Sequence, residues 1–153
     1  MRSTLGWTLG IFAAALLTGC ATTPAGREVR TTADMQWHGR IYAGEQGELS
    51  EDQVSVATAT MTRLATGSTR ATVTLRGGLI EAAYPWHIHV GTCGSQGPIV
   101  GNPDSYDTLS ASASGMGSAT ANLDTALDPA KTYYINLHRE DMGIVACGNM
   151  TRG

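Results

Sequence analysis

The chain has 153 residues, which is enough for one domain and leaves little room for two, and its formal net charge is −3. Only 15% of the residues are charged, 42% are hydrophobic and 19 are glycines. This composition excludes coiled coils and long amphipathic helices, and it argues against disorder and against nucleic-acid binding. The prevalence of Ala, Thr, Gly, Ser and Val instead favours a β-rich domain with many tight turns.

The chain begins with an export signal. Arg2 precedes an apolar run over residues 5–17, which is shorter than the roughly 20 residues that a membrane-spanning helix needs. The run ends in Leu17-Thr18-Gly19-Cys20, which resembles the bacterial lipobox, whose cysteine is acylated and becomes the mature N-terminus. An ordinary signal peptide that ends near a cysteine is the alternative. Because Ala21 follows instead of an aspartate, we expect a lipid-anchored protein of the outer membrane that faces the periplasm.

These features divide the chain into three parts. Residues 1–19 are the expected signal peptide, residues 20–35 a lipidated N-terminus and flexible tether, and residues 36–153 a β domain. Within the domain, residues 44–53 form an acidic loop and residues 91–107 a long loop rich in Gly, Pro and Asn. Two-residue alternation of apolar and polar side chains predicts strands around 54–64, 70–76, 79–90, 118–123, 133–138 and 144–147. Short strands with frequent turns indicate an antiparallel sandwich or barrel.

Three of the four histidines fall on polar faces of predicted strands. His87 and His89 are two residues apart, so both imidazoles project to one side of their strand. His138 ends the next but one strand, on the face that also carries Tyr134 and Asn136. Neutral imidazole is a common protein ligand for copper and zinc, so these histidines are candidate metal ligands. A solvated or hydrogen-bonded histidine pair is the alternative.

Cys93 and Cys147 remain once Cys20 is assigned to the lipid anchor. In an exported domain two thiols most often form a disulfide. Such a bond would close a long loop, contribute roughly 3–4 kcal/mol, and bring the two histidine-bearing segments together. Two unpaired buried thiols are the alternative.

Taken together, these motifs resemble the copper/zinc superoxide dismutases over residues 58–153. The matching features are the His-x-His pair, the cysteine after it, Gly97-Pro98, the late histidine and the terminal Ala146-Cys147-Gly148. The resemblance implies a Greek-key β-barrel in which His87, His89 and His138 bind copper. It also implies that Cys93 is bonded to Cys147.

The chain departs from that family at several functional positions. Ile99 stands where the family has the histidine that bridges copper and zinc, and Ile144 where it has the arginine that guides superoxide. Between His89 and His138 there is no histidine to bind zinc, so copper is the expected cofactor and zinc is not. Arg139 is the remaining candidate for a catalytic positive charge.

A second resemblance leaves the function open. His-x-His followed by Gly97-Pro98 and a late Tyr-x-x-Asn-x-His is similar to the CHRD domain, a β-sandwich module without an established activity that normally lacks the two cysteines. Three hypotheses follow: a zinc-free copper-dependent superoxide dismutase, a copper-binding or copper-buffering lipoprotein, and a structural β-sandwich. The expected partners are accordingly superoxide or copper ions, with no nucleic acid. His38, Met142 and Met150 are weaker candidate copper ligands, with solvation or packing as the simpler role.

Overall fold

The computed structural model describes residues 35–48, 50, 52–77 and 82–153. The signal peptide, Cys20 and the tether predicted from the sequence lie outside these residues. The described part contains strands, one 3₁₀ turn and no α-helix, and none of it forms a helix long and apolar enough to cross a membrane. The elements are β1 (Met35–Ala43), β2 (Ser55–Arg63), β3 (Thr69–Arg76), β4 (Ala83–Tyr84), β5 (Trp86–Val90), η1 (Pro103–Ser105), β6 (Leu109–Ser110), β7 (Met116–Leu123), β8 (Tyr133–His138) and β9 (Ile144–Arg152).

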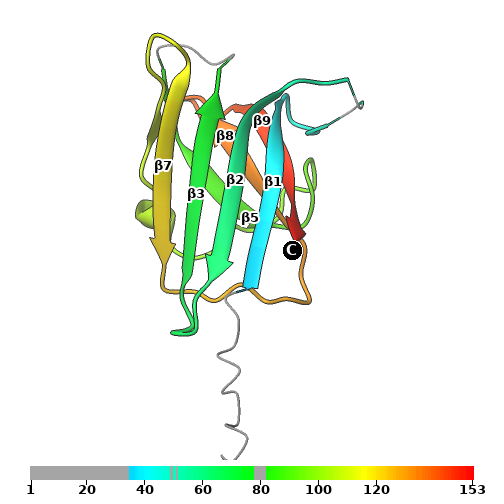
Figure 1. Ribbon diagram of the computed structural model, residues 1–153, viewed down its shortest axis with the longest axis vertical. Helices are drawn as coiled ribbons and strands as arrows, with labels where there is room; N and C mark the ends of the chain where they lie inside the picture. Colours follow the sequence, from blue (N-terminus) through cyan, green and yellow to red (C-terminus); the bar gives the residue numbers. More distant parts are fainter. Residues whose placement is uncertain (1–34, 49, 51, 78–81) are drawn as a thin grey trace, which may run out of the picture.

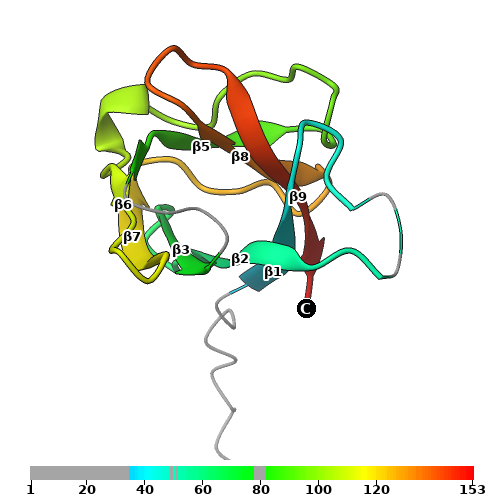
Figure 2. The same ribbon diagram turned by 90° about the horizontal axis from the view of Figure 1, so that it is seen from above.

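Seven strands form one antiparallel sheet in the order β5-β8-β9-β1-β2-β3-β7, and β4 pairs with β6 in a small second sheet. The large sheet curls so strongly that β5 and β8 lie across from β1, β2 and β3, which gives a half-barrel (Figures 1 and 2). After the β1–β2–β3 meander the chain crosses to β5, returns to β7 beside β3, and crosses again to β8. Crossings of this kind are typical of Greek-key folds. All the strand pairs of the described residues are antiparallel, so the all-β antiparallel class predicted from the sequence is confirmed.

The inner face of the curled sheet holds one hydrophobic core. Along β3, Ala71, Val73 and Leu75 are fully buried, while the side chains between them face outward, as the alternation predicts. Both walls contribute large side chains to this core, among them Trp37, Ile41, Trp86, Ile88, Ile135 and Leu137. On β5 and β8, the residues that alternate with these core residues therefore point to the outer face of that wall.

Two strands differ from the sequence expectations. The alternation did not predict β1, because Gly39 interrupts the apolar pattern between the buried Trp37 and Ile41. A side chain does not fit at this position, since a Cβ at Gly39 would collide with the side chain of Met150. The predicted strand 144–147 is too short, since β9 continues to Arg152. Its pattern weakens at Gly148, which packs so closely on β1 that a Cβ would meet the Arg40 carbonyl oxygen.

Candidate metal centre

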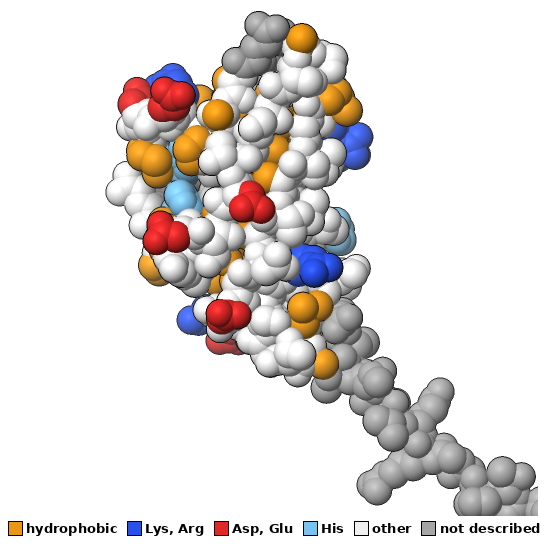
Figure 3. Space-filling model, turned by 90° about the vertical axis from the view of Figure 1, so that its left-hand side faces the viewer, with side chains coloured by type: hydrophobic (Ala, Val, Ile, Leu, Met, Phe, Trp, Pro, Cys, Tyr) orange, Lys and Arg blue, Asp and Glu red, His pale blue; other side chains and the backbone are white. Residues whose placement is uncertain are grey.

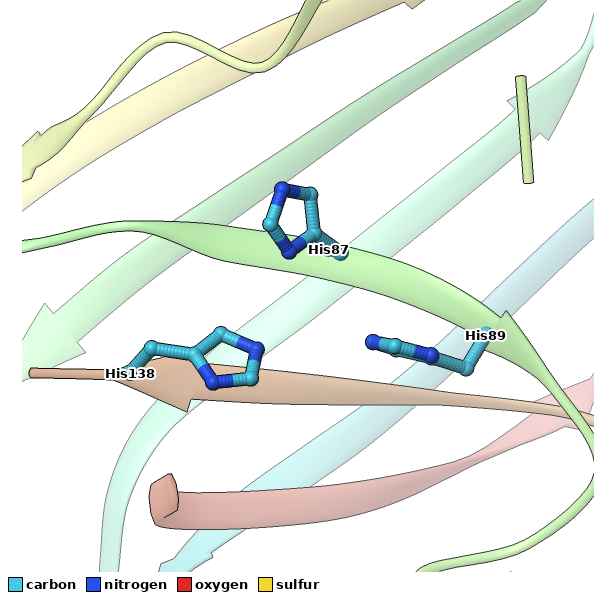
Figure 4. Close-up of side chains that lie close together, drawn as sticks. All are labelled: His87, His89 and His138. Carbon is cyan, nitrogen blue, oxygen red and sulfur yellow. The ribbon is translucent and has the colours of Figure 1, made fainter. Parts of the chain in front are cut away.

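Three histidines converge on the outer face of the β5–β8 wall. In the antiparallel register of β5 and β8, His87 pairs with Asn136 and His89 with Tyr134, while His138 follows at the end of β8. One ring nitrogen of each histidine lies within 4.8 Å of the other two. Figure 4 shows the three rings around one space, with His87 and His89 on β5 and His138 on β8. The convergence expected from the strand alternation together with the predicted disulfide is therefore present.

Backbone carbonyls orient two of the rings. His89 Nδ1 lies 2.8 Å from the Gly97 carbonyl oxygen, and His138 Nδ1 lies 3.1 Å from the Met142 carbonyl oxygen. A carbonyl only accepts hydrogen bonds, so in both neutral rings Nδ1 carries the proton and Nε2 carries a lone pair. Met142 adopts a left-handed φ of 66° in the turn after β8, a conformation that favours glycine. Both Nε2 atoms are thus fixed as acceptors.

The nitrogens left over by these contacts are buried and unpartnered. Among the described residues His87 Nδ1, His89 Nε2 and His138 Nε2 have no hydrogen-bond partner. Leaving a buried polar atom unsatisfied costs about 1–3 kcal/mol, so each such atom calls for an explanation. A metal bonded to imidazole at about 2.0–2.1 Å would satisfy all three, once small ring movements bring the nitrogens closer together. The donor set therefore fits a metal ion.

Two tyrosine rings pack against the histidine rings. The Tyr134 ring stacks on His89 with centroids 5.0 Å apart, and its hydroxyl oxygen accepts a hydrogen bond from the Gly97 amide at 2.9 Å. Tyr106 meets His87 edge-on with centroids 5.1 Å apart, and its hydroxyl donates to the Val100 carbonyl at 2.7 Å. Tyr106 was not among the site residues predicted from the sequence. Its place in an irregular loop gives no periodicity from which its contact with His87 could be found.

Burial keeps the cluster neutral. Desolvation, followed by the proximity of His138 and His89, lowers the pKa of His87 from 6.5 to about 4. Desolvation also lowers the pKa values of His89 and His138. The hydrogen bonds to the Gly97 and Met142 carbonyls raise these pKa values, but by less than desolvation lowers them. Near neutral pH all three imidazoles therefore have the protonation state that metal binding requires, and no proton has to leave first.

The lowered pKa values predict a stability that depends on pH. Above pH 6.5 His87 is neutral in both the folded and the unfolded chain, whereas between pH 6.5 and about 4 only the unfolded chain takes up the proton. The free energy of unfolding of the metal-free protein should therefore fall as the pH is lowered, by about 1.5 kcal/mol between pH 6.5 and 5 from His87 alone. Urea unfolding in the presence of a chelator measures this. His87→Gln should flatten the slope, and an equal slope in both proteins would contradict the prediction.

The predicted disulfide is present and holds the loop that follows β5. Cys93 and Cys147 are bonded, with Cα atoms 5.9 Å apart, and the Cys93 amide donates to Asn149 Oδ1 at 2.8 Å. The loop then turns back along β5, where the Val90 amide donates to the Pro98 carbonyl at 3.0 Å. The disulfide thereby joins β9 to the segment that supplies the Gly97 carbonyl to His89.

The positions that depart from the dismutase pattern lie beside the site. Ile99 forms an isolated antiparallel bridge with His89, and Ile144 pairs with His138 across β8 and β9. Both side chains are half-buried and neither can bind a proton or a metal. The immediate surroundings of the two histidines are thus aliphatic at these two positions.

The remaining candidates lie elsewhere in the described residues. Arg139 is exposed, forms an ion pair with Asp141 at 3.4 Å, and lines a pocket that includes none of the three histidines. His38 is exposed on β1 and is not part of the cluster. The Met142 side chain is 51% exposed, and Met150 packs in the core. Met142 contacts the cluster through its backbone carbonyl, and Arg139 adjoins it in the chain as the residue after His138.

The cluster is nearly enclosed. The side chains of His87, His89 and His138 are 8%, 9% and 6% exposed, respectively. In Figure 3 imidazole surface is visible between hydrophobic side chains, with acidic side chains nearby. The rings are thus slightly exposed on this face, whereas the three unpartnered ring nitrogens themselves are buried.

Comparisons of the chain with protein-family models, with curated proteins and with solved structures give no match. The structure itself provides an all-β half-barrel, a buried three-histidine cluster and a disulfide beside it.

Proposed function

We propose that the protein binds one copper ion through His87 Nδ1, His89 Nε2 and His138 Nε2. Two observations carry this proposal: one ring nitrogen of each histidine lies within 4.8 Å of the other two, and one ring nitrogen of each is buried without a hydrogen-bond partner. Two of them are fixed as acceptors, and all three rings are held neutral, which suits a cation. No carboxylate or thiolate of the described residues belongs to the group.

Copper is the proposed metal because of the donor chemistry. Imidazole suits copper, zinc, iron and nickel, whereas magnesium and calcium prefer oxygen ligands. Among divalent first-row ions, affinity for a given nitrogen site is highest for Cu²⁺, and three imidazoles also accommodate Cu⁺. Copper, when bound, supplies a one-electron redox couple at this site.

The proposed location is the bacterial envelope, with a lipid on Cys20 as the membrane anchor. The sequence of residues 1–20 supports this, and the Cys93–Cys147 bond suits an oxidising compartment. Copper held at this location would be bound at the membrane surface by a tethered domain. We therefore favour copper binding or buffering in the envelope as the function.

Copper binding is tested by titration of the disulfide-bonded chain starting at Ala21, which removes the Cys20 thiol as a competing ligand. Competition with a chromophoric chelator should give one copper per chain, and His138→Ala should weaken binding by at least 100-fold, because two imidazoles remain. His38→Ala is the matched control, since His38 is exposed on β1 away from the cluster, and it should bind like the wild type. Equal binding by wild type and His138→Ala would contradict the proposal.

A second candidate function is superoxide dismutation, favoured by the slight exposure of the three rings on one face. Reduction of superoxide to hydrogen peroxide consumes two protons, and Ile99 beside His89 can deliver none. Arg139 directly follows His138 in the chain, but it forms an ion pair with Asp141, whose negative charge offsets its positive charge. Water must then supply the protons.

For the copper-loaded protein we therefore expect a second-order rate constant well below the diffusion ceiling of about 10⁸–10⁹ M⁻¹s⁻¹, with little dependence on ionic strength. Pulse radiolysis measures the rate, and the His138→Ala protein is the control. Bound copper without any decay above that control would eliminate the dismutase function and leave copper binding intact. A rate near the ceiling would contradict the expectation.

A further inference from the structure

Asn136 has a buried carboxamide with an unsatisfied oxygen. Its side chain is 4% exposed, and among the described residues Oδ1 has no hydrogen-bond partner. A neutral amide oxygen buried without a partner is costly, and most buried side-chain oxygens in native proteins have one. Neither the fold nor the three-histidine site described above uses this atom.

The strand register places Asn136 at the site. It is the direct cross-strand partner of His87 on β5, and it lies two residues before His138 on the same face of β8. Directly opposed residues of an antiparallel pair have Cβ atoms about 4.5–5.5 Å apart. The flanking residues Ile135 and Leu137 occupy the core on the opposite face. Asn136 therefore shares the outer face with the histidines.

The unpartnered atoms form one chemical set. Only four buried side-chain atoms of the described residues lack a partner, and they are three histidine nitrogens and Asn136 Oδ1. All four belong to β5 and β8, and His89 Nε2, His138 Nε2 and Asn136 Oδ1 are acceptors. One water molecule has two protons to donate, which is too few for such a set. A cation, by contrast, can bind several such lone pairs at once.

We propose that Asn136 Oδ1 is a fourth ligand of the metal ion, which makes the site three nitrogens and one oxygen. This inference rests on the proposed metal-binding function. Carbonyl oxygen is a harder ligand than imidazole, so it favours the divalent over the monovalent state of copper. Asn136 thereby helps to determine which oxidation state the site holds.

The test compares the disulfide-bonded wild type with Asn136→Leu, which keeps the approximate shape and removes the oxygen. The variant should bind Cu²⁺ about 10–100-fold more weakly and Cu⁺ nearly unchanged, and the visible spectrum of the Co²⁺-loaded protein should shift. Asn136→Asp retains an oxygen ligand and should restore Cu²⁺ affinity. Asn122→Leu is the control, because Asn122 lies on β7 and pairs with Arg70, away from the site.

Stability of the metal-free protein gives a second readout. Removal of the unsatisfied oxygen should leave the melting temperature of metal-free Asn136→Leu equal to that of the wild type or above it. Unchanged Cu²⁺ affinity, an unchanged Co²⁺ spectrum, or a lower melting temperature without metal would each overturn the role of Asn136. Failure of the wild type itself to bind any of these metals would instead overturn the proposed function, before any variant is compared.

Discussion

Copper should raise the melting temperature of the disulfide-bonded chain starting at Ala21 by roughly 12–20 °C when free copper exceeds the dissociation constant about a thousandfold. Under the proposed function the ion binds the folded chain, in which β5 and β8 bring the three imidazoles together, and that assembly is lost on unfolding. The gain of about 4 kcal/mol follows from mass action alone. Differential scanning calorimetry over a series of copper concentrations measures the shift.

Two histidine variants separate the site from general copper binding. His89→Ala removes one of the three clustered nitrogens and should abolish most of the shift. His38→Ala removes an exposed imidazole on β1 and should keep the full shift. An equal shift in both variants would mean that copper binds outside the cluster, and no shift in the wild type would mean that copper does not bind the folded state preferentially.

The sequence predicted the histidine cluster because its geometry is periodic. Strand alternation places His87 and His89 on one face, and the same alternation places His138 on the polar face of its own strand. Alternation alone did not show that β5 and β8 are neighbouring strands. The expected disulfide supplied that link, and the register of β5 and β8 agrees with it.

The parts of the site that were not predicted depend on irregular backbone. The carbonyls of Gly97 and Met142 select the histidine tautomers, but any residue has a carbonyl, so no residue type announces this role. Tyr106 reaches His87 from the loop after η1, where no period applies. Asn136 was visible on the polar face of its strand, yet its missing hydrogen-bond partner is evident only from the packed structure.

Contacts between distant parts of the chain also explain why β1 was not predicted from the sequence. Gly39 interrupts the apolar pattern of β1 because Met150 of β9 occupies the space of a side chain. β9 in turn continues past Gly148 because β1 and β8 both pair with it. β1 and β9 depend on contacts between residues that are far apart in the chain, whereas β3 is evident from its own alternation.

Replacing both cysteines, as in the Cys93→Ala/Cys147→Ala protein, should lower the free energy of unfolding by about 4 kcal/mol, because the bond closes a loop with a sequence separation of 54 residues. It should also weaken copper binding by about 10-fold, since the freed loop carries the Gly97 carbonyl that orients His89. Urea unfolding and chelator competition measure the two effects.

The two effects have different causes and can be separated. Wild type reduced with a phosphine should unfold like the double variant, which shows that the bond and not the substituted side chains carries the stability. The Tyr134 hydroxyl also holds Gly97, and Val90 pairs with Pro98, so the loop keeps part of its position without the disulfide. If stability falls by about 4 kcal/mol while copper affinity stays the same, these contacts alone position His89, and the disulfide stabilises the fold without shaping the metal site.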